Sequence, residues 1–169
     1  MKYLIYVFFS FALITSCSQK NEEPFTIYLV RHAEKDVSDK TNSDPTLTPC
    51  GEERAKSLAV FFDQVALEKV YSSDYIRTKD TANPTAESKN KDLTLYNPDA
   101  LNAIAQVLLE RKENALVVGH SNTTGVLAGL LCDQKIEPFD ESIYNRIYQV
   151  VISDKTAQLQ VFHTAFSCE

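Results

Sequence analysis

Apolar residues follow two kinds of pattern along this chain, and the two patterns alternate. Phe25 to Val30 and Ala115 to Val118 are continuous runs of apolar or β-prone residues, which is typical of strands covered on both faces. Elsewhere apolar residues recur at helical spacing, as between Ala55 and Phe62. This alternation predicts an α/β fold, a three-layer α/β/α sandwich around a mostly parallel central sheet.

Shorter segments complete the predicted sheet. We expect a strand near Lys69 to Ser72 and another from Asp92 to Tyr96. Arg146 to Ile152 and Gln158 to Phe162 flank the turn-forming stretch Ser153 to Thr156, which is the pattern of a hairpin. The hairpin predicts an antiparallel addition to the sheet at the C-terminal end. The irregular stretch before it, from Cys132 to Asn145, is expected to overhang the site.

Capping residues and prolines predict where the helices begin and end. Pro84 should kink or end the second helix near Ala82 or Asn83, because a proline removes a backbone donor. The expected N-terminal caps and first helical residues are Thr48 with Pro49, Ser73 or Asp74, Pro98 with Asp99, and Ser121 or Asn122.

The first residues have the pattern of an export signal. An apolar run from Tyr3 to Ile14 follows Lys2 and is too short to span a bilayer comfortably. Leu13 to Cys17 resembles a lipobox, in which the cysteine is lipidated. We therefore expect a lipoprotein signal peptide over 1–16, a tether over 17–24 and one domain over 25–169, with Cys17 as the lipidation site. The alternative is an ordinary secretory signal in which Cys17 is incidental.

A lipidated Cys17 predicts an exported protein that is anchored to a bacterial membrane and faces the periplasm or the cell exterior. Three further cysteines, Cys50, Cys132 and Cys168, have no metal-ligand spacing. One disulfide is possible among them, with the pairing left open. The composition has 17 basic and 23 acidic residues and a net charge of -6, which excludes nucleic acid as an expected partner.

Basic side chains are predicted to meet at one edge of the sheet. Arg31 and His32 follow the first strand, Arg77 lies near the start of a helix that follows the second, and His120 follows the strand that begins at Ala115. The carboxyl ends of parallel strands share an edge where ligands bind. Two guanidinium groups and two imidazoles on that edge favour a doubly negative, tetrahedral ligand such as phosphate.

His32 has a second predicted role, as a nucleophile. Neighbouring cations disfavour the imidazolium form, which leaves a neutral ring nitrogen able to attack phosphorus. Water would then cleave the phosphohistidine, and the scheme requires no metal and no cofactor. Glu34 and Asp36 lie near His32 in the sequence, which makes a metal site the alternative, but the adjacent arginines would repel a cation.

Four segments of the chain resemble the histidine phosphatase superfamily, which is related to phosphoglycerate mutase. They are Leu29 to Glu34, Leu47 to Gly51 with Ala55, Tyr71 to Ala82, and Val117 to Asn122. The resemblance spans most of residues 25–125. It implies that His32 is the phosphorylated nucleophile, that Arg31 and Arg77 clamp phosphate, and that His120 contacts phosphate and stabilises the transition state. The compact size resembles the small phosphohistidine phosphatases.

The resemblance is weaker at the proton donor, for which many members supply a glutamate after the third strand. Asp99 is the nearest acid in this chain and is the candidate donor; its alternative role is a charge in the first turn of a helix. The weaker candidates are Glu34, Glu137, Asp140 and Glu141.

The predicted function is that of a phosphomonoester hydrolase, with a phosphorylated small molecule or phosphoprotein as substrate. The alternatives are a phosphate-ligand binding protein with little turnover, and a mutase.

Overall fold

The computed structural model describes residues 23–154 and 156–168. The predicted signal peptide over 1–16, the lipidation site Cys17 and most of the tether lie outside the described residues. The strands are β1 (Phe25–Arg31), β2 (Lys69–Ser73), β3 (Leu93–Tyr96), β4 (Ala115–Gly119), β5 (Arg146–Ser153) and β6 (Thr156–His163). The helices are α1 (Pro49–Phe61), α2 (Ile76–Ser88), α3 (Leu101–Arg111) and α4 (Thr124–Leu131).

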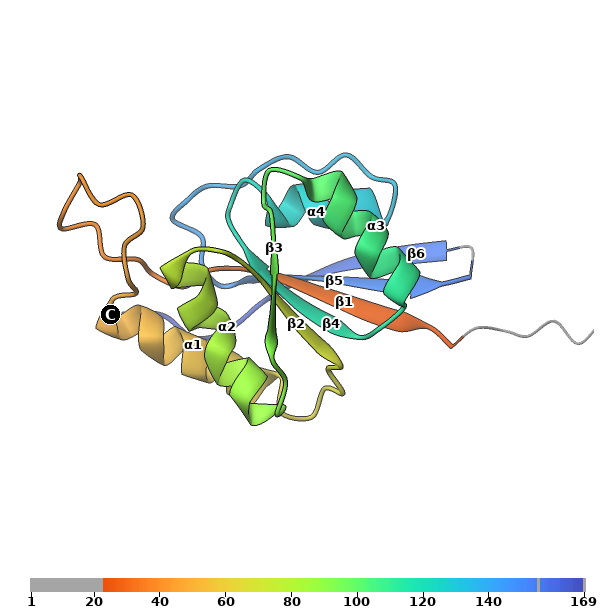
Figure 1. Ribbon diagram of the computed structural model, residues 1–169, viewed down its shortest axis with the longest axis horizontal. Coiled ribbons are helices and arrows are strands. Elements are labelled where there is room, and N and C mark those ends of the chain that lie inside the picture. Colours follow the sequence, from red (N-terminus) through yellow and green to blue (C-terminus); the bar gives the residue numbers. More distant parts are fainter. Residues whose placement is uncertain (1–22, 155, 169) are drawn as a thin grey trace, which may run out of the picture.

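The strands form one sheet in the order β3-β2-β4-β1-β5-β6 (Figure 1). The four strands from β3 to β1 are parallel, whereas β5 pairs antiparallel with β1 and β6 antiparallel with β5. This confirms the mostly parallel sheet with a C-terminal antiparallel hairpin. Arg31 pairs with Gly119, so the carboxyl ends of β1 and β4 lie side by side in the middle of the sheet.

Helices cover both faces of the sheet, as Figure 1 shows, with α1 and α2 on one side and α3 and α4 on the other. One apolar cluster joins Leu58 of α1 to Val30 and Val118 of the sheet. The other joins Leu108 of α3 to the opposite face, through Leu29 among others. Successive strand residues point to opposite faces, so Leu29 and Val30 serve different clusters. The predicted three-layer sandwich is therefore confirmed.

Of the two outcomes predicted for Pro84, a kink or an end of the helix, the second is wrong. Pro84 lies inside the helix, which continues to Ser88. A proline removes one backbone donor from a helix, but Thr85 and Ala86 beyond it are buried. Burial of this last turn outweighs the missing hydrogen bond.

The predicted starts of three helices are also wrong, because turns precede them. The N-cap of α2 is Tyr75, not Ser73 or Asp74, and its side chain makes no capping bond. Before α3, the Asn97 side chain accepts a hydrogen bond from the Asp99 N–H at 3.0 Å, and this turn delays the helix to Leu101. The N-cap of α4 is Thr123, after a turn that includes Ser121 and Asn122.

In the described part of the chain, no helix is long and apolar enough to cross a membrane.

The C-terminal tail is tied back to the start of α1. A disulfide joins Cys50 to Cys168, with 5.8 Å between their Cα atoms, and Cys132 is a free thiol. The Arg54 Nη1 atom donates to the Phe166 carbonyl at 3.0 Å. Glu34 lies beside the two bonded cysteines, but sulfurs joined in a disulfide are not thiolate ligands for a metal.

Candidate active site

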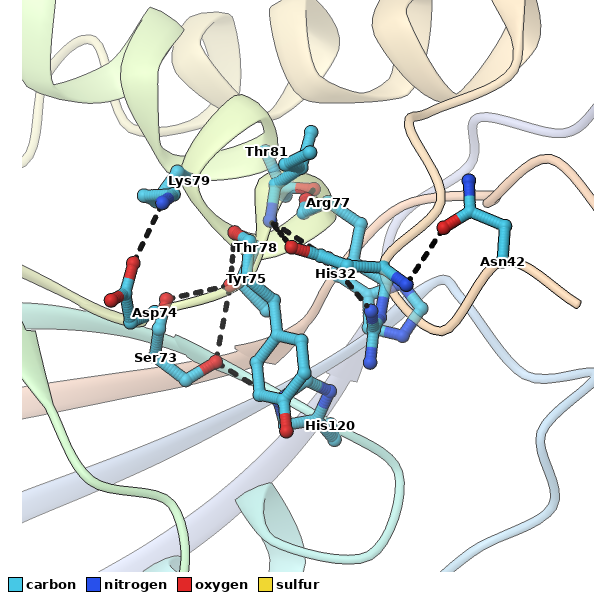
Figure 2. A network of polar contacts seen from close by, with 12 residues as sticks. His32, Asn42, Ser73, Asp74, Tyr75, Arg77, Thr78, Lys79, Thr81 and His120 are labelled. Atoms are coloured by element: carbon cyan, nitrogen blue, oxygen red, sulfur yellow. Dashed lines mark hydrogen bonds and ion pairs between the residues drawn. The ribbon is translucent and has the colours of Figure 1, made fainter.

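The predicted site residues lie around one open pocket at the carboxyl ends of β1, β2 and β4. The pocket has a volume of about 280 Å³. Its lining residues include all five predicted at this site: Arg31, His32, Arg77, Asp99 and His120. Figure 2 shows the His32 and His120 rings close to Tyr75 and Arg77. These residues come from separate parts of the sequence, and the parallel order of the strands brings them together.

His32 is buried and held on both sides by backbone groups. The backbone N–H of His32 donates to the Gly119 carbonyl at 2.9 Å, and the ring Nδ1 lies 2.7 Å from the Ala33 carbonyl oxygen. A carbonyl can only accept, so Nδ1 carries the proton and Nε2 has the free lone pair. Burial, followed by the charges of Arg31, His120 and Arg77, lowers the pKa of His32 to about 3 despite the bond to Ala33. The ring is therefore a neutral base.

His120 is the second neutral imidazole of the site. Its ring centroid lies 5.5 Å from that of His32 and 5.0 Å from that of Tyr75. Burial first, then the charges of Arg77 and Arg31, lower the pKa of His120 to about 4. Each neutral imidazole has one N–H that can donate to an anion and one nitrogen that can accept a proton. Two imidazolium ions at this separation would repel each other.

Hydroxyl groups at the end of β2 and in the first turn of α2 orient His120. The His120 Nε2 atom lies 2.9 Å from the Ser73 Oγ, which in turn lies 3.1 Å from the Thr78 Oγ1. The Thr78 hydroxyl donates to the Ser73 carbonyl at 2.8 Å. Figure 2 shows this chain of contacts running from His120 to the first turn of α2. The ring is thus fixed by buried groups.

Arg31 is positioned by the segment between α4 and β5. Its Nη1 donates to the backbone carbonyls of Glu141 and Ile143. Its guanidinium carbon lies 4.1 Å from the centre of the Tyr144 ring, a cation–π geometry. The segment from Cys132 to Asn145 thus lies against the site, because its backbone holds Arg31, one of the two arginines predicted to bind phosphate.

Arg77 is positioned by one acidic and one aromatic residue. Its Nη1 pairs with the Asp44 Oδ1 at 3.2 Å, and its guanidinium carbon lies 4.4 Å from the centre of the Tyr75 ring. Within the part of the chain that the structure describes, the Nε atoms of both Arg31 and Arg77 are buried without a hydrogen-bond partner. Buried donors are nearly always bonded in folded proteins. Both arginines line the pocket, and their positive charge there fits an anionic ligand.

Asp44 also caps the start of α2. The Ile76 N–H donates to both of its carboxylate oxygens, at 3.0 and 3.2 Å. The cap comes from the loop after β1, because Tyr75 at the N-cap position has no side-chain acceptor bonded to the helix. One carboxylate therefore holds the first helical residue and the second, Arg77. No sequence pattern marked Asp44, since a contact over more than thirty positions leaves no local signal.

Asp99 lines the pocket from the turn before α3. Because α3 begins at Leu101, the alternative role of Asp99 as a charge in the first helical turn is wrong. Glu141 also lines the pocket, and its carboxylate lies 3.9 Å from the Lys35 Nζ. The remaining candidate acids have other partners: Glu34 pairs with Arg54 at 2.6 Å, Glu137 with Lys135 at 2.7 Å, and Asp140 accepts from the Ser142 N–H at 2.7 Å.

The segment from Leu47 to Gly51 supports the end of β1. The Thr48 N–H donates to the Glu34 carbonyl at 2.8 Å, and a side chain at position 51 would collide with the same Glu34 backbone. A glycine is needed here for the close approach of two backbones. The segment therefore fixes the chain two residues after His32 without entering the pocket itself.

Sequence patterns missed several residues of the pocket wall. Lys35 and Tyr75 line the pocket directly, whereas Ser73 and Tyr144 position the histidine and arginine side chains. Tyr75 and Ser73 lie within the segment Tyr71 to Ala82, so their places beside Arg77 were the signal available. No comparable signal marked Tyr144, which follows an irregular stretch.

Residues 27–105 match the family model described as histidine phosphatase superfamily (branch 1). Arg31, His32, Arg77 and Asp99 fall inside the matched range, and His120 lies after it. A search of curated protein sequences found no significant match.

Solved structures of phosphatases share the fold. The protein histidine phosphatase SixA complexed with tungstate has a TM-score of 0.66 and 17% identity, over 82% of this chain and 97% of that one. A putative α-ribazole-5'-P phosphatase from Escherichia coli has a TM-score of 0.69 and 18% identity, and the match covers 86% of this chain and 99% of that one. A mycobacterial glucosyl-3-phosphoglycerate phosphatase has a TM-score of 0.64 and 13% identity, and the match covers 85% of this chain and 100% of that one. At these identities the likeness shows the fold. The family match shows that residues 27–105 of this chain are similar to the histidine phosphatase superfamily.

Proposed function

We propose that this protein is a phosphomonoester hydrolase that works through a phosphohistidine on His32. The observation that carries the proposal is the convergence of Arg31 and Arg77 with two neutral histidines on one pocket. A phosphate dianion can accept two parallel N–H donors from one guanidinium group. At an effective dielectric constant of about 20, each unit charge pair at ~4 Å contributes about 4 kcal/mol before desolvation.

The proposed first step is attack by the lone pair of His32 Nε2 on phosphorus. The new P–N bond forms as the ester P–O bond breaks, and the departing alcohol oxygen takes a proton from the Asp99 carboxylic acid. Arg31, Arg77 and His120 stabilise the negative charge on the phosphoryl oxygens during transfer. Water then attacks phosphorus, Asp99 takes up one proton from it, and orthophosphate leaves with the His32 lone pair restored.

The proposed substrate is a phosphate ester of a small molecule or of a protein. The structural neighbours include a histidine phosphatase as well as phosphatases of metabolite esters, so the fold is compatible with several leaving groups. The SixA structure holds tungstate, a tetrahedral oxyanion. The rival functions are a phosphate-binding protein with little turnover and a mutase that returns the phosphoryl group to substrate.

His32→Ala tests the nucleophile. We expect loss of at least about 10³-fold in kcat for a generic aryl phosphate, because the covalent route is removed. His163→Ala is the matched control, since His163 is exposed at the end of β6 and should leave kcat unchanged. Unchanged turnover in His32→Ala would exclude His32 from the mechanism. Stoichiometric labelling of His32 by radioactive substrate without steady product release would favour the binding protein, and stimulation by a bisphosphate would favour the mutase.

Asp99→Asn tests the proton donor. Alkyl phosphates have poor leaving groups and need the proton, so we expect their kcat to fall about 10²-fold more than that of an activated aryl phosphate. Asp92→Asn, an exposed aspartate just before β3, is the control. An equal effect on both substrate types would exclude Asp99 and would make Glu141 the next acid to test.

We further propose that the protein is exported and held at a bacterial membrane by a lipid on Cys17. The Cys50–Cys168 disulfide supports an oxidising location, because such bonds persist outside the reducing cytoplasm. Cys17→Ser should release the protein from the membrane fraction of expressing cells. Its persistence there would contradict lipidation.

A further inference from the structure

A second hollow adjoins the phosphate pocket on the side of β3. It has a volume of about 380 Å³. Three of its lining residues, Tyr75, Pro98 and Asp99, also line the phosphate pocket, so the two spaces are neighbours. The other lining residues are Asp74, Leu95, Tyr96 and Asn97.

The floor of this hollow contains an exposed leucine. Leu95 is 52% exposed, although its neighbour Tyr96 is buried in the cluster beneath α3. The alternation of strand side chains places Leu95 on the face that carries α2, and it pairs in register with Ser72 near the carboxyl end of β2. Together with the Tyr75 ring and Pro98, it gives the hollow apolar surface beside the chemistry.

The charges of the hollow differ from those of the phosphate pocket. Two carboxylates line it, and Asp74 is paired with Lys79 at 2.7 Å. Arginine, lysine and histidine are absent from its lining among the described residues. A second phosphate or carboxylate of a substrate would therefore meet carboxylates and no lining cation here.

We infer that this hollow receives the alcohol part of the substrate, and that it selects aromatic or other apolar groups over small polar or anionic ones. The inference rests on the proposed function, because it places the phosphoryl group in the adjoining pocket. Asp99 lines both spaces, so this residue lies at the boundary between the phosphoryl group and the alcohol. That is where a donor to the leaving oxygen has to be. Leu95 is then a specificity-determining residue.

The test compares three alkyl phosphates whose reacting centres are alike: benzyl, ethyl and 4-carboxybenzyl phosphate. We expect kcat/KM for benzyl phosphate to exceed that for ethyl phosphate at least about fivefold, because a ring is partly buried in an open hollow. The 4-carboxybenzyl ester should fall below the benzyl ester. Leu95→Thr should reduce the benzyl-to-ethyl ratio of kcat/KM at least about threefold, because the benzyl ester loses more than the ethyl ester.

Val161→Thr is the matched control, since Val161 is an exposed apolar residue on the other edge strand and is 45% exposed. It should leave the ratio unchanged. If the wild type hydrolyses benzyl and ethyl phosphate equally well, or if Leu95→Thr leaves the ratio intact, the inference is wrong while the phosphatase proposal stands. If the wild type hydrolyses none of the esters, both are wrong.

Discussion

Individual residues at the site are held in states that suit an anion. His32 and His120 are neutral because burial and the two arginines oppose their protonation. Arg31 and Arg77 are each held through Nη1 and stacked on a tyrosine, and their Nε donors have no partner in the described chain. Most residues that position these groups come from distant segments, which is why the site residues could be predicted and the contacts that support them could not.

The histidine pair predicts how stability depends on pH. The pKa values of the two histidines in the folded protein, about 3 and about 4, lie below the ordinary value of 6.5. At a pH between the folded and the ordinary values, the unfolded chain therefore binds more protons than the folded one. The contribution of the histidines to the free energy of unfolding should be fully present above about pH 6.5 and should fall on acidification towards the folded pKa values. At about pH 5 we expect each histidine to cost about 2 kcal/mol, measured by urea unfolding. In the double variant His32→Gln with His120→Gln, the acid loss should shrink by that sum; an undiminished loss would contradict the prediction.

Asp44 provides a second residue-scale prediction, as a positioning residue for Arg77. Asp44→Ala removes the cap of α2 and the partner of Nη1, so KM for an aryl phosphate should rise about tenfold. Asp44→Asn keeps an oxygen acceptor without the charge and should recover most of the affinity. Asp39→Ala alters the same loop away from Arg77 and serves as the control. Tighter phosphate binding in Asp44→Ala would mean that repulsion, not positioning, dominates.

At the scale of elements, helix starts divide into those set locally and those set by distant groups. α1 begins where predicted, because Thr48 accepts from the Gly51 N–H at 3.0 Å and Pro49 follows it. α2 is capped by Asp44 and α3 is delayed by an Asn97 turn. α2 also continues beyond Pro84, where Thr85 and Ala86 are buried. A rule based on the proline alone does not take this burial into account.

The local cap of α1 can be tested directly. Thr48→Ala leaves the Gly51 N–H without its acceptor and should lower the free energy of unfolding by about 1 kcal/mol in a urea titration. Thr46→Ala, an exposed threonine two positions earlier, should change it by less than about 0.5 kcal/mol. Equal effects of the two substitutions would show that the cap contributes nothing specific.

At the scale of the whole molecule, the chain closes on itself. The hairpin β5–β6 adds to β1, and the tail beyond it returns to α1, where Cys168 meets Cys50 and Phe166 packs on Arg54 with 4.9 Å between ring centre and guanidinium carbon. The disulfide therefore closes a loop with a sequence separation of 118, which contains strands β2 to β6 but not β1.

Opening this loop should destabilise the protein. For so long a loop we expect Cys50→Ser with Cys168→Ser to lower the free energy of unfolding by about 2–4 kcal/mol in urea. Cys132→Ser is the control for loss of a cysteine that forms no disulfide, and its thiol contacts the Ala128 carbonyl within its own helix. A double variant as stable as the wild type would mean that the tail contributes nothing to closure.

Local pattern determined the kind of each element, most of the strands and the four basic residues, because strand runs, helical spacing and strand ends are properties of neighbouring residues. Tertiary structure alone decided the partner of Cys50, the capping of α2 by Asp44, the support of Arg31 by Glu141 and Ile143, and the hollow beside Leu95. Each of these depends on contacts between segments far apart in the chain, and such contacts are set by how the layers pack.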